Sequence, residues 1–385
     1  MAIYRDHRAV RIALGAICIA ILCVLLTAGL WPFCAPKNGV RWIAGGNGLK
    51  FGHDAIVVSA DGFRSASPRG DCTLELLLQP ADFRGSGTFL AFDSSKDPTV
   101  PFAVQQRWDD MAIDRAGTEA EGRRIRLWLA TNRVFQPGQR TLVTITGEPR
   151  LTVVYVNGLK TKASSDFGLR SDDLTGRLVL GSSTVRGSWT GEMAGLAVYD
   201  SALSPVEVQE HYRRWREAGS PVVPGERAPV ALYRFNEGAG DTIHDQSGHG
   251  HDLVIPSRYF VLHPQFLQSP IGAFEDRWSG WRSWSYWANV CLNVAGFVPM
   301  GFFFTAYFSL IRPLGRPRIA VVAMGLAVSL TIEVGQYFLP TRDSGINDLI
   351  TNTLGTAIGV VLCSPRLIRG FVSKIPKTTG GPVPS

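Results

Sequence analysis

The chain has 385 residues, of which 45% are hydrophobic, and its formal net charge is +7 at pH 7. This length leaves room for two or three domains, and the hydrophobic residues gather in four apolar stretches, at about 12–31, 290–311, 319–339 and 349–365. Each stretch approaches the roughly 20 residues that a helix needs to cross a bilayer. The sequence therefore predicts four membrane spans, and the positive charge beside them gives no support to nucleic-acid binding.

The first span follows a basic N-terminus and ends near Trp31-Pro32. Its length favours a membrane anchor over a cleaved signal peptide, which also begins with a basic end and an apolar run. If the four spans alternate in direction, ten basic residues share one side of the membrane: Arg5, Arg8, Arg11, Arg312, Arg316, Arg318, Arg366, Arg369, Lys374 and Lys377. That side should be cytoplasmic because cytoplasmic loops are rich in Lys and Arg. We therefore expect both termini in the cytoplasm and the segment between spans one and two outside.

This external segment is rich in short strand-like runs separated by turns. The clearest runs are 72–80, 87–95, 124–130, 141–147 and 177–183. Asn157-Gly158 suits a type I′ hairpin, because both central residues of that turn need positive φ. Ser204, Pro205 and Glu207 form a capping-box pattern at the start of a short helix. The pattern predicts an all-β sandwich or jelly roll.

The external segment also resembles a known family. "YVNG" (155–158) and "WTGEMAGLAVYDSALSPVEVQEHY" (189–212) are similar to the concanavalin A-like, laminin-G-like jelly roll. Residues 231–256 resemble the strand pair that normally opens such a domain, yet here they follow a Pro/Gly linker at its far end. We therefore expect a circularly permuted jelly roll in which 231–256 supplies the missing strands. A truncated second repeat is the alternative.

The family resemblance implies glycan or calcium binding for the external domain, as its members often show. Glu237, Asp241 and Asp245 are the candidate calcium ligands, because calcium prefers carboxylate oxygens; the alternative is that they are turn residues. Cys34 and Cys72 lie outside the spans, where they either form a disulfide in an oxidising compartment or remain free thiols.

A tryptophan stripe precedes span two, with Trp278, Trp281, Trp284 and Trp287 at every third position. Tryptophan prefers the membrane interface, where the ring is buried while the indole N–H stays hydrated. We interpret the stripe as an interfacial anchor, with a sugar-stacking platform as the alternative.

The last three spans each carry one stripe of polar and small residues at helical spacing. Their members are Asn289, Asn293 and Gly296 in span two; Ser329, Glu333, Gln336 and Tyr337 in span three; and Asp348, Asn352, Gly355 and Gly359 in span four. Small residues let helices approach closely, and amides hydrogen-bond across the gap. A carboxylate at mid-membrane costs roughly 2.5–3.5 kcal/mol, so Glu333 needs partners there.

We expect these stripes to form one polar site in the outer half of the bilayer. Its candidate residues are Glu333, Gln336, Arg342, Asp348, Asn352 and Asn293. Asn293, Asn352 and Gln336 are the expected partners of Glu333, with Arg342 as its countercharge. An ionisable group inside a membrane is a functional-site hypothesis by default, and a purely structural hydrogen-bond knot is the alternative.

The membrane part resembles the VanZ-like family. The likeness rests on "TAGLWPF" (27–33), "NVAGFVPMGFF" (293–303) and "SLTIEVGQYFLPTRDSGINDLITNTLGTAIG" (329–359). The family's motif residues correspond to Asn293, Phe297, Pro299, Gly301, Glu333, Gln336, Arg342, Asp348, Asn352 and Gly355. Asn289 stands where the family often has Asp, which puts in doubt any role that needs a second acid at this position. The resemblance implies kinship with a factor for low-level resistance to the glycopeptide teicoplanin.

Together, these patterns predict a multidomain protein with a four-helix transmembrane bundle and an external all-β jelly-roll sandwich. The expected parts are 1–36 (N-terminus and first span), 37–270 (β-sandwich), 271–288 (Trp-rich segment), 289–366 (three spans) and 367–385 (cytoplasmic tail, partly disordered). We expect a bacterial plasma-membrane envelope protein whose outer domain recognises a glycan or protein. The alternative is an enzyme acting on a lipid-linked substrate, with Glu333 as general acid/base. The expected partners are the bilayer and a surface glycan, lipid-linked precursor or envelope protein; calcium in the outer domain is the one cofactor considered.

Overall fold

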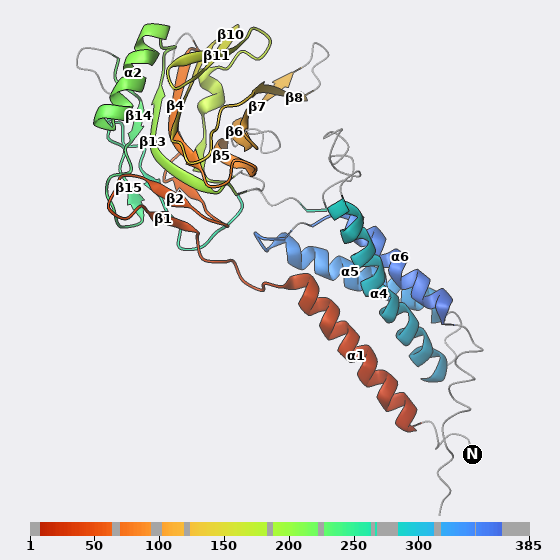
Figure 1. Ribbon diagram of the computed structural model, residues 1–385. Helices are drawn as coiled ribbons and strands as arrows, with labels where there is room; N and C mark the ends of the chain where they lie inside the picture. The colour runs from red at the N-terminus through yellow and green to blue at the C-terminus, as the bar shows by residue number, and fades with distance from the viewer. Residues whose placement is uncertain are drawn as a thin grey trace, which may run out of the picture. The chain divides into compact units, whose positions relative to one another are not determined.

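The computed structural model describes residues 8–63, 70–93, 102–118, 124–182, 188–221, 227–262, 266–267, 284–311, 317–342 and 344–363. It divides the chain into two compact units (Figure 1). Ala35–Pro264 holds the strands and one helix, here the β unit; Met1–Cys34 and Gln265–Ser385 hold the long helices, here the helical unit. The predicted tail, 367–385, lies outside the described residues.

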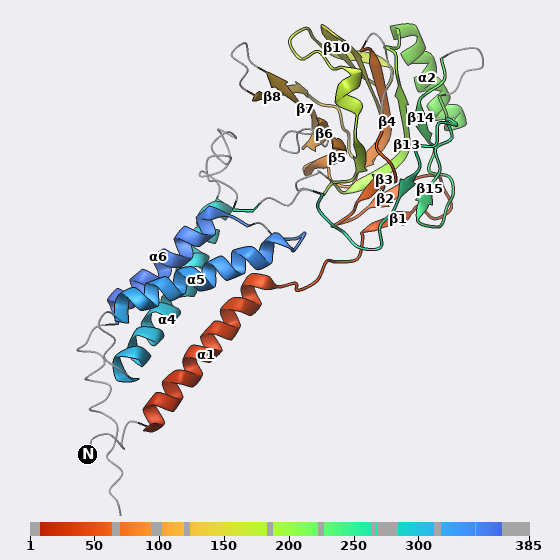
Figure 2. The ribbon, with the colours of Figure 1, turned by 180° about the vertical axis from the view of Figure 1, so that it is seen from behind.

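The β unit is a sandwich of two eight-stranded antiparallel sheets. The first sheet runs in the order β1 (Val40–Trp42), β2 (Leu49–Phe51), β13 (Gly191–Tyr199), β4 (Cys72–Pro80), β9 (Thr141–Glu148), β10 (Leu151–Val156) and β11 (Leu159–Ser164), with β14 (Ala231–Tyr233) also paired to β13. The second runs β15 (Thr242–Ile243), β16 (Leu253–Val254), β3 (Val57–Ser59), β12 (Arg177–Leu180), β5 (Ser86–Asp93), β6 (Phe102–Arg107), β7 (Asp110–Thr118) and β8 (Arg124–Thr131). Figure 2 shows β5 to β8 beside the layer that contains β4 and β13.

The main core fills the space between the two sheets. In β4, Leu74, Leu76 and Leu78 are all fully buried, and the period-two geometry of a strand directs them to the same face. Their partners from the other side include Phe89 and Trp189, whose ring centroids lie 5.8 Å apart. The expected all-β sandwich is therefore confirmed.

Local turn and cap signals are found where the sequence places them. Asn157 and Gly158 turn β10 into β11 with φ values of 52° and 78°, the positive values that a type I′ turn requires. Ser204 caps helix α2 (Pro205–Ala218), and its capping box with Glu207 is complete. The five predicted strand runs all form strands, β4, β5, β8, β9 and β12.

The segment 231–256 completes the same sandwich. Its first strand, β14, pairs with β13 in one sheet, and β16 pairs with β3 in the other. The segment therefore supplies strands to this domain, as the permuted jelly roll requires, and the alternative of a truncated second repeat is wrong. The two ends of the β unit also meet: the Asn38 amide donates to the Pro256 carbonyl (2.8 Å), and Lys37 forms a β-bridge with Arg258.

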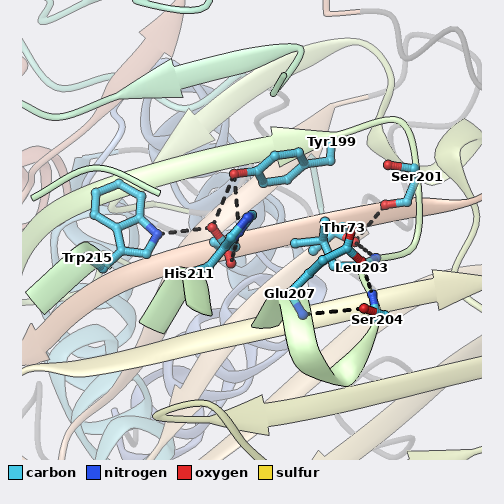
Figure 3. Close-up of polar contacts among 9 residues, drawn as sticks. Thr73, Tyr199, Ser201, Leu203, Ser204, Glu207, His211 and Trp215 are labelled. Carbon is cyan, nitrogen blue, oxygen red and sulfur yellow. Dashed lines mark hydrogen bonds and ion pairs between the residues drawn. The ribbon is translucent and has the colours of Figure 1, made fainter. Parts of the chain in front are cut away.

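Helix α2 packs on the first sheet, where His211 and Trp215 of the helix lie beside Tyr199 of β13 (Figure 3). Glu75 of β4 lies in the same contact. Glu75 is fully buried and accepts a hydrogen bond from the Trp215 indole N–H at 3.0 Å. Glu75 Oε1 lies 3.1 Å from His211 Nδ1. Glu75 Oε2, which accepts the indole N–H, also lies 3.4 Å from the Tyr199 hydroxyl. A buried carboxylate is tolerated only when such partners satisfy it, so this cluster fixes α2 on the sheet.

The helical unit contains α1 (Arg8–Leu30), α4 (Trp284–Ile311), α5 (Pro317–Tyr337) and α6 (Ile346–Leu362). Three described helices, within Val10–Leu30, Trp287–Ser309 and Pro317–Tyr337, are long and apolar enough to cross a membrane. The fourth, α6, is apolar but has 17 residues. The expectation of four spans is therefore supported by length for three of them, and for α6 it stays a prediction.

Glycines bring α6 against α4 with almost no gap between their backbones. A Cβ added to Gly355 would lie 2.2 Å from the Val294 carbonyl oxygen, and one added to Gly359 would lie 2.1 Å from that of Val298. The close approach expected for Gly355 and Gly359 is therefore present. At Gly296 an added Cβ meets nothing within 4 Å, so the packing role expected for Gly296 is wrong. Spacing along a helix showed which glycines share a face, but it could not show which of them contact the backbone of a neighbouring helix.

Candidate functional site

The polar stripes of the helical unit meet where α4, α5 and α6 pack together. On α5, Glu333 is 0% exposed and Gln336 is 7% exposed; on α6, Asn352 is 5% exposed. Residues three or four apart share one face of a helix, which is why Ser329, Glu333 and Gln336 are buried together. We name Glu333, Gln336, Asn352, Asp348, Asn293 and Ser329 the polar cluster.

The carboxylate of Glu333 holds the start of α6. Its Oε2 accepts a hydrogen bond of 2.7 Å from the backbone N–H of Gly345, the N-cap residue of that helix. The first N–H groups of a helix lack partners within it, and a negative charge near them is favourable. Glu333 therefore anchors the loop that joins α5 to α6.

The amide partners expected for Glu333 bind other groups. The Asn352 amide donates to the Ser329 hydroxyl at 3.0 Å, joining α6 to α5. The Asn293 amide donates to Asp348 Oδ1 at 2.9 Å, joining α4 to α6. The predicted residues are thus brought together, but in two amide pairs rather than around the carboxylate.

Gln336 and Arg342 both bind the end of α1. The Gln336 amide donates to the Gly29 carbonyl at 2.9 Å, and Arg342 Nε donates to the Trp31 carbonyl at 2.7 Å. The expectation that Arg342 is the countercharge of Glu333 is therefore not met. The reason is physical: the last carbonyls of a helix lack partners and attract a positive charge. Sequence spacing gives no sign of α1 as a competing partner.

Three oxygens of the polar cluster remain without a donor among the described residues. They are Glu333 Oε1, Gln336 Oε1 and Asn352 Oδ1, each buried from solvent. A buried acceptor without a hydrogen bond is costly, typically about 1–3 kcal/mol. Native proteins contain few such groups, and the described part of this chain has others outside the cluster, among them Thr131 Oγ1 and Thr144 Oγ1.

Part of the tryptophan stripe lies outside the described residues, namely Trp278 and Trp281. Trp284 and Trp287 form the first turn of α4 and are 86% and 49% exposed. Exposed indoles at the end of an apolar helix suit an interfacial anchor, which stays a prediction.

The candidate calcium ligands of the β unit serve its turns. Asp245 accepts backbone N–H bonds from Leu232 and Ser247, and Glu237 accepts one from His244. Asp241 is exposed. Among the described residues no group of three or more His, Cys, Asp or Glu side chains could hold a metal ion.

Cys34 and Cys72, the two cysteines expected outside the spans, are free thiols in the structure. Cys72 is fully buried at the start of β4, where burial, reinforced by the charges of Asp173 and Asp71, raises the pKa of its thiol. Cys34 is exposed. The two cysteines belong to different units, so a disulfide between them stays a prediction.

A cleft of about 440 Å³ opens between β8 and β11, the edge strands of the two sheets. Trp128 lies along it with 60% of its surface exposed, and Arg107 lies 5.8 Å from the ring centroid. The cleft is lined by Trp128, Leu129, Ala130, Lys162, Ala163, Ser164, Ser165 and Asp166. The sequence did not predict this site, because β8 and β11 are separate in the chain and approach each other only in the folded sandwich. The one available signal was Trp128 within a strand-like run.

These features define a class of protein: apolar helices of membrane length joined to an all-β sandwich with an open polar cleft. Comparison with family models gives the particular families. Residues 238–369 match VanZ/LLP1, and residues 51–209 match the Concanavalin A-like lectin/glucanases superfamily. The chain thus contains a segment similar to VanZ-type domains and a segment similar to concanavalin A-like domains, so both resemblances seen in the sequence are confirmed. Its long apolar helices are consistent with a membrane protein. The sandwich extends beyond its match, since β14 to β16 follow residue 209, and the VanZ match begins within the β unit.

Solved structures with a similar sandwich include three from different organisms. The carbohydrate-binding module CBM40 of Ruminococcus gnavus IT-sialidase, bound to α2,3-sialyllactose, is 13% identical, covers 42% of this chain and 95% of its own, and has a TM-score of 0.33. The SAP-like pentraxin of Limulus polyphemus is 12% identical (58% and 94% covered, TM-score 0.31). Domain 4 of an extracellular arabinanase from Geobacillus stearothermophilus, in complex with arabinotriose, is 16% identical (46% and 85% covered, TM-score 0.35). No curated protein matches the chain. These similarities concern the fold alone.

Proposed function

We propose that this protein is a non-catalytic component of a bacterial cell envelope, in which the helical unit sits in the plasma membrane and the β unit recognises a glycan on the outer side. The observation that carries the proposal is the cleft between β8 and β11, with Trp128 exposed beside it. The concanavalin A-like match supports the same conclusion.

The lining of the cleft suits a sugar better than an apolar ligand. An exposed indole offers a flat apolar surface on which the C–H face of a sugar ring can stack. Lys162, Asp166 and two serines, Ser164 and Ser165, line the same cleft and supply donors and acceptors for sugar hydroxyls. Arg107 lies against the ring of Trp128, and such a contact holds an aromatic side chain in place.

A glycan array probed with the full-length protein in nanodiscs tests this proposal. We expect binding to a limited set of glycans and a loss of at least tenfold in affinity for Trp128→Ala, which corresponds to about 1.4 kcal/mol. Trp108→Ala is the matched control, because Trp108 is 69% exposed in the turn between β6 and β7 of the same sheet but does not line the cleft. Binding in the presence and absence of calcium tests the expectation that the outer domain binds this ion. Uniform background across the array, or equal losses in both variants, would refute glycan recognition by the cleft.

The VanZ match leads to the finer proposal that the protein contributes to glycopeptide tolerance. The growth of cells that express the wild type or Trp128→Ala is compared at increasing teicoplanin concentration, at equal protein amounts in the membrane. Higher tolerance with the wild type is expected. Equal tolerance in cells with and without the protein would remove this part of the proposal and leave glycan recognition to be judged by the array.

A further inference from the structure

The cleft between β8 and β11 is bordered by strands whose charged residues are all basic. Strand β8 contains Arg124 and Arg126, strand β11 contains Lys160 and Lys162, and neither strand contains Asp or Glu. The β unit as a whole has as many Asp and Glu residues as Lys and Arg residues, so its formal net charge is zero. The excess of basic residues is therefore a local feature of this edge of the sandwich.

Two exposed cations lie beside the tryptophan of the cleft. Lys162 is exposed and lines the cleft together with Trp128. Arg107 is also exposed, and its guanidinium carbon lies 5.8 Å from the centroid of the Trp128 ring. The strands that carry these cations lie on opposite sides of β8, because β6 belongs to the sheet that ends in β8 and β11 lies across the cleft. A ligand stacked on the indole would therefore lie beside positive charge.

No described carboxylate neutralises these two cations. Within the ranges that the structure describes, neither Lys162 nor Arg107 forms an ion pair. Asp166 is the one acidic residue in the lining of the cleft, and its described hydrogen bond is with the Ser165 hydroxyl, not with Lys162. The positive charge beside Trp128 is therefore available to a ligand.

We propose that the glycan bound by the cleft is anionic, with a sugar ring stacked on Trp128, its acidic group bound by Lys162, and further positive charge supplied at the ring by Arg107. The inference rests on the proposed function, because it names the class of glycan that the same cleft takes. A lysine ammonium acts as a point charge and binds both carboxylate and phosphate. The acidic group is therefore a carboxylate or a phosphate on the sugar.

The preference for an anion follows from the water that a ligand displaces. A neutral sugar on Trp128 would take water from the Lys162 ammonium and the Arg107 guanidinium and return only contacts with neutral hydroxyls. An acidic group returns a hydrogen bond between two charged partners, and such bonds are roughly twice as strong as neutral ones. The cleft should therefore prefer a glycan with an acidic group to the same glycan without it, and salt should weaken this preference by screening.

The test compares glycans that share one backbone and differ only in charge. Oligomers of glucose, galactose and mannose are each prepared in a neutral form, with C6 oxidised to a carboxylate, and with the C6 hydroxyl phosphorylated; any glycan that the array identifies is added in the same forms. Binding to the full-length protein is measured in nanodiscs of zwitterionic lipid. At about 0.1 M NaCl, acidic forms of a bound backbone should bind on the order of tenfold more tightly than its neutral form, and the ratio should approach one at about 1 M. The tighter of the two acidic forms shows whether the bound group is a carboxylate or a phosphate.

Variants of Lys162 separate the effect of charge from that of shape. Lys162→Ala should lose most of the preference for acidic forms, whereas Lys162→Arg, which keeps the positive charge, should retain it. Lys50→Ala is the matched control, because Lys50 is an exposed lysine of β2, near the opposite end of the first sheet, and it should bind as the wild type does. If a Lys162 variant fails to fold, the salt dependence of the wild type decides.

Two results would overturn the inference and leave glycan recognition by the cleft intact. One is equal or tighter binding of the neutral forms by the wild type. The other is a preference for acidic forms that persists in Lys162→Ala, which would mean that the acidic group binds elsewhere. Binding of no glycan in any form would refute the proposed function, and the inference with it.

Discussion

The contact between α4 and α6 makes Gly355→Ala the most direct test of the helical unit. The added Cβ would lie 2.2 Å from the Val294 carbonyl oxygen, about 1 Å inside ordinary van der Waals contact. The obstacle is backbone, which cannot move away by changing a rotamer. The helices must therefore separate by about 1 Å, and overpacking of this kind costs roughly 1–3 kcal/mol.

Gly296→Ala on α4 is the matched control. Nothing lies within 4 Å of its added Cβ, and Ala is favoured over Gly inside a helix by about 0.5–1 kcal/mol. This variant should be as stable as the wild type or slightly more stable. The two substitutions are chemically identical, so the gain in helix propensity cancels and their stabilities should differ by the overpacking cost of about 1–3 kcal/mol.

The assay is thermal unfolding of the full-length protein in nanodiscs, followed by circular dichroism at 222 nm. Most of the described helix belongs to α1, α4, α5 and α6, so this signal reports mainly on the helical unit. Gly355→Ala should melt well below Gly296→Ala. Equal melting temperatures, or a lower one for Gly296→Ala, would refute the backbone contact between α4 and α6.

Two further predictions concern the β unit, and unfolding followed by tryptophan fluorescence tests both. Glu75→Ala should destabilise the β unit by about 3 kcal/mol or more, since it leaves buried donors unpaired. Glu210→Gln is the control: it disrupts only the surface ion pairs of α2 and should change the stability little. Equal losses of stability in the two variants would contradict the role of Glu75. Burial raises the pKa of Asp245, but hydrogen bonds from three backbone N–H groups outweigh burial and hold that pKa below its usual value. The carboxylate therefore contributes stability above the unfolded-state pKa, and this stability is lost as the pH falls through the folded-state pKa. Asp245→Asn should be less stable than the wild type at neutral pH, and its stability should depend less on acid pH. An unchanged pH profile of stability would contradict this.

Local signals in the sequence predicted much of the β unit. Asn157-Gly158 and the Ser204 cap depend on residues a few positions apart, and both occur as expected. The pairing of 231–256 with the same sandwich was also predictable, because this segment resembles the opening strands of a jelly roll and the chain before it lacks them. The cleft beside Trp128 was not predictable, since it forms where edge strands of two different sheets approach.

The polar cluster shows the complementary limit. Helical spacing identified which faces are buried, including those of Glu333, Gln336 and Asn352. It could not identify the partner of each atom, because that depends on the rotation and depth of neighbouring helices. The decisive partners are backbone groups, the N–H of Gly345 and the carbonyl of Gly29, and backbone groups leave no trace in a sequence pattern.

The meeting of the two ends of the β unit at Asn38 and Pro256 has a mechanical consequence. A force applied to a ligand bound by the β unit would pass through the sandwich to the two chain segments that enter and leave it. Because these segments meet at one place, they would share that force. The bridge from Lys37 to Arg258 closes the domain at that place, so tension would reach this short join before it could peel strands from either sheet.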